Sequence, residues 1–155
     1  MQTSPLQLDD AFIGEITVTP NESAAPVAPG AIVVNATPSY ARHNENPLKW
    51  IVKLLVEFQS RETAPSPYEG HVECEGYFTV VNPEQPEAKQ RKLVAVNAPT
   101  ILYSMARDMV ATITGRSRHG KFLLPSVSFI DQLIAFPDDP KPEEHASTPA
   151  PVTPV

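Results

Sequence analysis

The sequence contains one cysteine among 155 residues, Cys74. A single thiol cannot form a disulfide within the chain, and it cannot build a cysteine-rich metal site. This composition fits a reducing compartment, and we expect the protein in the cytoplasm. Residues 1–10 lack a basic stretch followed by an apolar run, so no secretory signal is predicted. No apolar segment approaches the ~20 residues that a membrane-spanning helix needs, and we expect no direct membrane insertion.

Positive charge is also scarce. The chain has 12 Lys and Arg against 18 Asp and Glu, which gives a net charge of -6. Proteins that bind nucleic acids do so largely by neutralising phosphates with Lys and Arg. The charge therefore argues against a nucleic-acid partner and against an anionic-membrane binder.

Proline is abundant and unevenly distributed. Of 18 prolines, six follow Ala135, in a segment with few apolar side chains. Such a segment buries too little apolar surface to offset the entropy of ordering. We predict a disordered, acidic, proline-rich tail at residues 137–155 and a flexible lead-in at residues 1–10. The remaining residues, 11–136, are enough for one domain with a modest core.

Four segments with strand-like alternation precede residue 82. They are expected at residues 11–19, 31–37, 50–59 and 68–81. In the first, Phe12, Ile16 and Val18 should share one face, with Ile13, Glu15 and Thr17 on the other. In the third, apolar side chains occupy every second position from Trp50 to Phe58. Pro38 suits a sheet edge better than a sheet centre. Strands joined by loops point to an antiparallel sheet.

A long helix is predicted to follow. Asn97 is a suitable N-cap, Pro99 suits the first turn, and Gly115 is a natural stop. Residues 82–92 read as a loop or one loose turn. The helix has a wide apolar surface, more than one sheet requires, which suggests a second partner or deeper burial within one subunit.

After Gly115 the chain is basic up to Lys121 and then apolar over residues 122–127. A second short helix is expected beyond this crossover loop. The sequence therefore predicts an α+β fold: a four-stranded antiparallel sheet, a long helix, an apolar crossover loop and a short second helix. The crossover loop either covers the core or lines an exposed groove.

The order of residues over about thirty-five positions resembles the carboxy-terminal half of the SecB family of protein-export chaperones. The matching residues are Ile101-Leu102-Tyr103, Ala106-Arg107-Asp108, Phe122, Pro125, Val127 and Phe129. The resemblance implies an ATP-independent holding chaperone that keeps unfolded preproteins competent for export and translocation. It also implies a homotetramer, built as a dimer of dimers, with no catalytic activity and no cofactor.

The resemblance assigns roles to several residues. The implied client-binding groove comprises Val72, Cys74, Met105, Met109, Phe122, Leu123, Leu124, Val127 and Leu133, and the implied oligomer interface comprises Leu102, Met105, Ala106, Val110 and Ile113. Glu15 matches one acidic position at which family members dock the SecA motor, whereas Thr19 and His71 stand where the family has other acids. Two alternatives follow: a SecB-like chaperone for other clients, such as unstable antitoxins, or a small adaptor that binds one folded partner through residues 116–127.

Two further patterns imitate sites. Gly115, Gly120 and Lys121 have P-loop spacing, but Phe122 replaces the Ser or Thr that would hold magnesium, and the run follows a helix. His71, Glu73 and Glu75 share one strand face and could ligate zinc, although a solvated strand shows the same alternation. No nucleophile with a base and an orienting group can be assembled, so we expect no catalysis and no metal.

Overall fold

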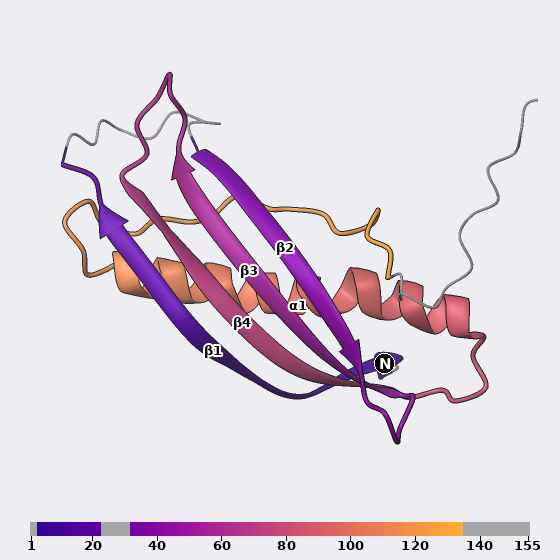
Figure 1. Ribbon diagram of the computed structural model, residues 1–155. Coiled ribbons are helices and arrows are strands. Elements are labelled where there is room, and N and C mark those ends of the chain that lie inside the picture. Colours follow the sequence, from indigo (N-terminus) through magenta and orange to yellow (C-terminus); the bar gives the residue numbers. More distant parts are fainter. Residues whose placement is uncertain (1–2, 23–31, 135–155) are drawn as a thin grey trace, which may run out of the picture.

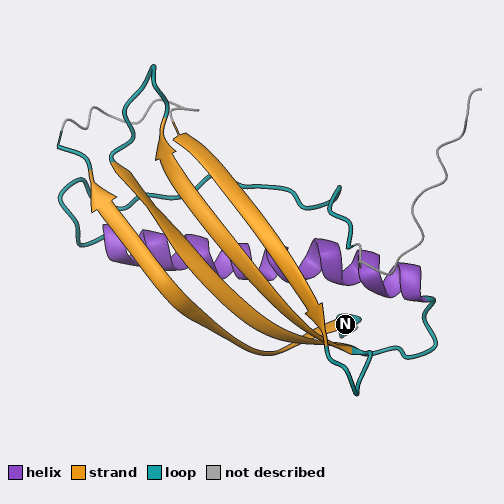
Figure 2. Ribbon diagram, viewed as in Figure 1, coloured by secondary structure: helices purple, strands orange, loops and turns teal. Residues whose placement is uncertain are grey.

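The computed structural model describes residues 3–22 and 32–134 and has two layers, a sheet and one helix lying obliquely behind it (Figures 1 and 2). The elements are β1 (Leu6–Pro20), β2 (Ile32–Arg42), β3 (Lys49–Ser60), β4 (Tyr68–Val80) and α1 (Glu87–Thr114). The strands form one sheet in the order β1-β4-β3-β2, and every neighbouring pair is antiparallel. The α+β architecture is therefore confirmed. Within the described ranges, no helix is long and apolar enough to cross a membrane.

The two central strands carry the core. Their inner faces point toward α1, and the alternation predicted for both is confirmed. The buried inner residues are Trp50, Val52, Leu54, Val56 and Phe58 of β3, with Tyr68, Val72, Cys74, Phe78 and Val80 of β4. The alternation continues over five pairs of positions. A register shifted by one residue would turn all these apolar side chains to the outer face, so the observed register is strongly favoured.

The edge strand β1 differs from its prediction in two ways. It begins at Leu6, so residues 6–10 belong to the sheet and not to a flexible lead-in. Its register against β4 shifts between Ile13 and Glu15, and a bulge of this kind reverses the alternation beyond it. Ile13 therefore packs against the core with Ile16, while Phe12 lies on the outer face and is 46% exposed. The predicted grouping of Phe12 with Ile16 is wrong.

The other edge strand, β2, extends beyond its predicted end. It continues through Pro38 to Arg42, paired along its whole length with β3 on one side only. The edge position predicted from Pro38 is confirmed. A strand at an edge can contain proline because the amide hydrogens on its free side need no partner strand.

The helix begins ten residues before the predicted N-cap. Asn97 lies inside α1, where its side-chain amide donates to the Leu93 carbonyl at 2.9 Å. Pro99 is also inside and leaves the Ala95 carbonyl without its usual amide donor. The Tyr40 hydroxyl of β2 donates to that carbonyl at 3.1 Å, and burial raises the pKa of Tyr40 to about 12. A tertiary contact thus replaces a hydrogen bond that the helix cannot make.

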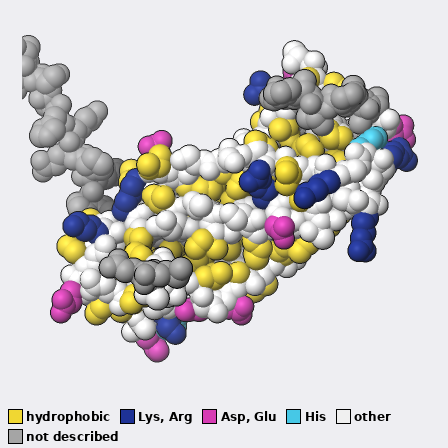
Figure 3. Space-filling model, turned by 180° about the vertical axis from the view of Figure 1, so that it is seen from behind, with side chains coloured by type: hydrophobic (Ala, Val, Ile, Leu, Met, Phe, Trp, Pro, Cys, Tyr) yellow, Lys and Arg dark blue, Asp and Glu magenta, His cyan; other side chains and the backbone are white. Residues whose placement is uncertain are grey.

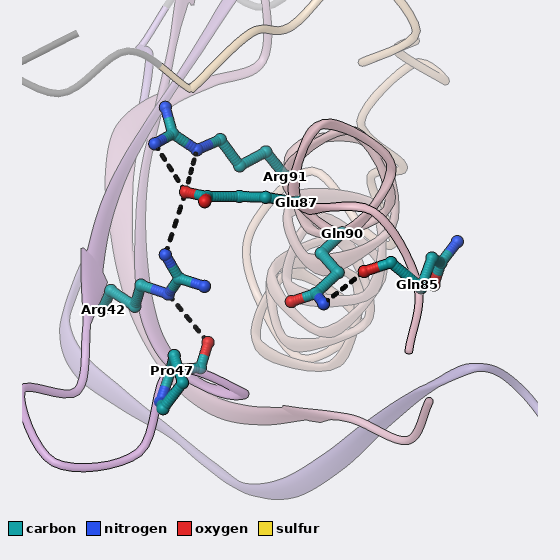
Figure 4. A network of polar contacts seen from close by, with 6 residues as sticks. All are labelled: Arg42, Pro47, Gln85, Glu87, Gln90 and Arg91. Atoms are coloured by element: carbon teal, nitrogen blue, oxygen red, sulfur yellow. Dashed lines mark hydrogen bonds and ion pairs between the residues drawn. The ribbon is translucent and has the colours of Figure 1, made fainter. Parts of the chain in front are cut away.

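Ion pairs between charged side chains stabilise the first turn of α1 (Figure 4). One carboxylate oxygen of Glu87 accepts from Arg91 at 2.7 Å and from Arg42 at 3.0 Å. These contacts lower the pKa of Glu87, and the hydrogen bond from Arg91 is the largest cause. Arg42 also donates to the Pro47 carbonyl at 2.8 Å, and its guanidinium lies 5.3 Å from the Trp50 ring centre. The first turn of α1 is therefore tied to the β2–β3 hairpin.

Beyond Gly115, which ends α1 as predicted, the chain returns along the helix in an extended conformation (Figure 1). We call residues 121–134 the crossing segment. It contains one turn at residues 130–131 and no helix as far as the description extends, so the predicted second helix is not found there. The predicted tail at residues 137–155 lies outside the described residues.

Candidate functional site

The crossing segment is attached to α1 through side chains. Three helix positions on one side of α1 bond the first half of the segment, and all three bonds involve its backbone. They join the Phe122 amide to Thr114 Oγ1 (2.9 Å), Arg107 Nε to the Leu124 carbonyl (2.7 Å) and the Tyr103 hydroxyl to the Pro125 carbonyl (2.6 Å). Because backbone groups are the same in every residue, these contacts constrain the path of the segment more than its sequence.

The side chains of the crossing segment divide into two sets. Phe122, Leu124 and Phe129 are buried, and the Phe122 ring lies 5.7 Å from that of Tyr68. The outward set, which is apolar and exposed, consists of Leu123 (54%), Ile130 (61%) and Leu133 (77%). One side of the loop therefore covers the core, and its other side presents apolar surface to solvent.

Four residues of the predicted client groove belong to the core of the subunit. Val72 and Cys74 lie on the inner face of β4, and Phe122 and Leu124 are covered from the crossing segment; none is accessible in the single chain. Burial raises the pKa of the Cys74 thiol to about 11. The thiol is therefore protonated at neutral pH and is a poor nucleophile.

The helix also divides its predicted interface residues. Leu102, Ala106 and Val110 are fully buried against the subunit's own sheet. They are therefore covered within the chain and cannot meet a neighbouring subunit in this conformation.

Four further apolar side chains of α1 lie outside this fully buried set. Ile101, Met105, Met109 and Ile113 follow one another four residues apart and so form a row on the helix, which we call the helix ridge. Met109 and Ile113 are each 36% exposed, while Ile101 and Met105 are half-buried. Met109, which was predicted for the client groove, thus lies in one row with Met105 and Ile113, which were predicted for the oligomer interface. Ile101 lies in the same row, although it was predicted for neither site.

Two shallow hollows lie between the second half of α1 and the start of the crossing segment. One, of about 290 Å³, is lined by Ser104, Arg107, Asp108 and Leu123. The other, of about 270 Å³, is lined by Asp108, Ala111, Thr112, Gly115, Arg116 and Lys121. Figure 3 views the molecule from this side and shows hydrophobic side chains interspersed with Lys and Arg. This face combines apolar contact area with charged groups that can meet a polypeptide backbone.

The basic loop before the crossing segment is held in place by Tyr68. The Tyr68 hydroxyl donates to the Gly120 carbonyl at 2.9 Å and accepts from the His119 amide at 3.0 Å. His119 Nε2 lies 2.6 Å from the Asn21 carbonyl, which joins this loop to the end of β1. Gly120 has a φ of 75°, a conformation that favours glycine. The loop follows a helix, so the strand-loop-helix order of a phosphate-binding P-loop is absent from it.

On the outer face of the sheet, two of the three residues considered for zinc have other partners. His71 Nε2 lies 3.3 Å from a Glu15 carboxylate oxygen. Glu75 accepts from the Tyr77 hydroxyl at 2.8 Å and pairs with Lys53 at 3.0 Å, and these contacts lower the pKa of Glu75. In the parts of the chain that the structure describes, no group of three His, Cys, Asp or Glu residues could hold a metal ion.

The same face carries a hollow of about 320 Å³ that sequence reasoning missed. Phe12 and Gly14 of β1 line it, together with Leu55 of β3 and Glu73 of β4. Phe12 lies between the two register shifts of β1 against β4, one between Leu8 and Asp10 and the other between Ile13 and Glu15. Alternation alone could not have located it, since a bulge has no reliable sequence signal here.

Solved structures similar to this chain were found. A SecB-like chaperone from Mycobacterium tuberculosis, solved in complex with a ChAD peptide from the HigA1 antitoxin, matches with a TM-score of 0.57 and 16% sequence identity, covering 79% of this chain and 91% of that one. A protein of unknown function from Streptococcus agalactiae matches with a TM-score of 0.45 and 11% identity, covering 78% and 97% of the two chains. No family model and no curated protein sequence matches.

At 16% identity the first likeness concerns the fold and not the activity. In this chain the fold consists of the four-stranded antiparallel sheet and the long helix behind it, both of which the sequence predicted. The chain therefore has the fold of the SecB-like chaperones.

Proposed function

We propose that this protein is an ATP-independent holding chaperone that binds unfolded polypeptide segments in the cytoplasm and catalyses no reaction. The observation that carries the proposal is the apolar outward side of the crossing segment, where Leu123, Ile130 and Leu133 are each more than half exposed. The SecB-like fold supports it. Apolar surface of this kind on a solvent-facing segment is typical of sites that bind other polypeptides.

The binding strength of such a surface suits a holding function. Burying one Leu-sized or Phe-sized anchor is worth roughly 1.5–3 kcal/mol before ordering costs, so one subunit holds a short segment weakly. Several subunits engaged by one long chain gain about 100- to 10,000-fold in avidity without any new type of contact. Weak and repeated contacts of this kind tolerate many sequences.

The proposal therefore requires assembly, and we propose a homotetramer that forms as a dimer of dimers through the helix ridge. Met109 and Ile113 present apolar side chains on the side of α1 that its own sheet leaves uncovered. A Met109→Asp, Ile113→Asp variant should dissociate the tetramer while each subunit stays folded. Light scattering measures the mass, and Thr112→Asp, at an exposed position of the same helix, is the matched control. A monomer mass for the wild-type protein would contradict the avidity argument.

For the clients, unstable antitoxins are favoured over export precursors. The similar chaperone was solved with an antitoxin peptide. Glu15, the residue proposed for docking SecA, already lies against His71 on the outer face. Hand-over of preproteins to SecA remains the second form of the proposal, and a pull-down with SecA that Glu15→Gln weakens would favour it.

The test is suppression of aggregation without nucleotide. The chain should suppress aggregation of several unrelated unfolded proteins, whereas an adaptor for one folded partner would suppress none. Replacing Leu123, Ile130 and Leu133 by Ser should weaken client binding by about tenfold or more, since three exposed anchors are lost. Ser126→Ala, at an exposed polar position in the same segment, is the control. Nucleotide binding that Lys121→Ala abolishes would instead favour the P-loop interpretation.

A further inference from the structure

Charge is distributed unevenly over this protein. The chain carries a net charge of -6, but residues 101–134 contain four Lys or Arg and only two Asp. These residues form the second half of α1, the basic loop and the crossing segment. On the opposite side of the sheet, the hollow of the outer face is lined by Glu73 and Glu75 together with Lys53. The surface around the crossing segment is therefore basic, in contrast to the chain as a whole.

Three cations border the two hollows beside the crossing segment, and we call them the basic rim. Arg107 lines the hollow of about 290 Å³ together with the exposed Leu123, and Arg116 and Lys121 line the hollow of about 270 Å³. Asp108 lines both, so the two hollows adjoin. Within the described part of the chain, none of the three cations forms an ion pair. Their charges are therefore available to a ligand.

Arg107 is held in place by the crossing segment. Its Nε donates to the Leu124 carbonyl at 2.7 Å. A guanidinium has five N–H donors in one plane, so the donors of its two terminal nitrogens remain for other partners. These donors match the two oxygens of a carboxylate and can bind it bidentately. Because Arg107 and Leu123 line the same hollow, one ligand can place a carboxylate on the first and an apolar side chain on the second.

We infer that the basic rim makes this chaperone selective for acidic clients, which are apolar segments with Asp or Glu side chains beside their apolar anchors. An apolar anchor of the client covers Leu123, and one client carboxylate pairs with Arg107. A second carboxylate pairs with Arg116 or Lys121. This inference rests on the proposed chaperone function and names the client class that the same surface prefers.

The spacing of the basic rim sets the spacing of the client carboxylates. Arg116 follows Arg107 by nine residues, which corresponds to about 13 Å along the helix axis. An extended client rises about 3.3 Å per residue, so its two carboxylates should be about four residues apart. The apolar anchor that covers Leu123 lies between them, since Leu123 borders the hollow of Arg107 and adjoins that of Arg116.

The contribution of the basic rim to affinity should be moderate and sensitive to salt. Arg116 and Lys121 are exposed, and single ion pairs between exposed charges contribute little. Several pairs act together at low ionic strength, because the Debye length is about 30 Å at 0.01 M salt and only about 3 Å at 1 M. We therefore expect a preference for acidic clients of about tenfold at low salt that disappears at about 1 M.

Peptides that differ only in charge test the inference on the full chain. Three labelled peptides share one apolar core and carry two Asp, two Asn or two Lys four residues apart. Both ends are blocked, so that no terminal carboxylate contributes. In fluorescence anisotropy at low salt, the Asp peptide should bind about tenfold more tightly than the Lys peptide, with the Asn peptide between them. Equal affinity for all three, or a preference for the Lys peptide, would overturn the inference.

Charge reversal in the protein locates the preference. A variant with Arg116→Glu and Lys121→Glu should bind the Lys peptide more tightly than the Asp peptide, because most of the rim has changed sign. Both positions are exposed. Trp50 fluorescence reports whether the variant is folded, and Arg116→Gln with Lys121→Gln, which should abolish the preference, replaces it if it is not. An unchanged preference in the folded variant would contradict selection by the rim.

A matched control reverses the same amount of charge elsewhere. Lys49 at the start of β3 and Lys89 in the first turn of α1 are exposed and line neither hollow of the rim. Lys49→Glu with Lys89→Glu should therefore keep the preference for the Asp peptide. Loss of the preference in this control would show that net charge alone decides, and it would overturn the assignment to the rim.

An aggregation assay separates this inference from the function on which it rests. If the chain suppresses aggregation of unfolded proteins but binds the three peptides equally, the selectivity fails and the chaperone function stands. If it suppresses no aggregation and binds none of the peptides, both fail. A preference for the Asp peptide that persists at about 1 M salt would overturn pairing by charge.

Discussion

Two adjacent leucines of the crossing segment should respond oppositely to the same truncation. Leu124 is completely buried and Leu123 is 54% exposed. Deleting a buried leucine side chain costs about 2–5 kcal/mol, because the apolar transfer energy is lost and a cavity remains. Substitutions at exposed positions usually change stability by less than about 0.5 kcal/mol. We therefore expect Leu124→Ala to lower the free energy of unfolding by about 3 kcal/mol and Leu123→Ala to leave it nearly unchanged.

Urea unfolding measures this difference directly. Trp50 is the only tryptophan and is almost fully buried, so its fluorescence reports on the core. With a denaturant dependence of about 2 kcal/mol per molar urea, a loss of about 3 kcal/mol lowers the midpoint by roughly 1.5 M. Both variants are compared at one protein concentration, because assembly contributes to apparent stability. Equal midpoint shifts for the two variants would refute the inward and outward assignment on which the client surface depends.

Three further predictions concern the fold around this surface. Tyr40→Phe should cost about 0.5–1.5 kcal/mol of unfolding free energy, and adding Pro99→Ala should recover part of it by restoring an amide donor for the Ala95 carbonyl; no recovery would contradict the replacement of that bond by Tyr40. Since burial raises the Cys74 pKa from 9.0 to about 11, alkylation by iodoacetamide at pH 8 should be about 100-fold slower in buffer than in urea, and fast alkylation of the folded protein would contradict this. Because Arg91 and Arg42 lower the pKa of Glu87, their stabilisation is present above its ordinary value of 4.5 and is lost as the pH falls below it. Glu87→Gln should therefore lower the melting temperature at pH 7 more than at pH 3, and an equal effect at both would count against the pairing.

The strands were predictable to the extent that burial repeats along them. In β3, every second residue from Trp50 to Phe58 is buried, so the pattern and the structure coincide. In β1, the register shift after Ile13 breaks the repeat, and Phe12 moved to the face opposite the predicted one. A local shift of one residue changes every later assignment in a strand.

The helix start was misplaced because local signals were overruled by tertiary contacts. Asn97 and Pro99 have the residue types of a helix N-terminus. Tyr40, distant in sequence, supplies the hydrogen bond that allows Pro99 inside α1, and Arg42 at the end of β2 pairs with Glu87 in the first turn. Neither contact can be inferred from the residues near the helix.

The sequence showed that the crossing segment is apolar, but it did not show which of its side chains face inward and which face outward. The extended segment has no long repeat of apolar and polar residues that would distinguish its two sides. The sequence therefore could not show that Leu124 faces inward and Leu123 outward. The resemblance assigned both residues to a groove. Which of them is accessible depends on the bonds from Tyr103 and Arg107 to the segment backbone, and these bonds belong to the folded chain alone.

Aggregation of chemically unfolded proteins, followed by light scattering in the absence of nucleotide, tests the central claim most directly. The account predicts that the full chain suppresses aggregation of several unrelated proteins and that a variant with Ser at positions 123, 130 and 133 does so about tenfold less well. Full activity in that variant, or no suppression by a wild-type protein whose tryptophan fluorescence shows it to be folded, would contradict the account.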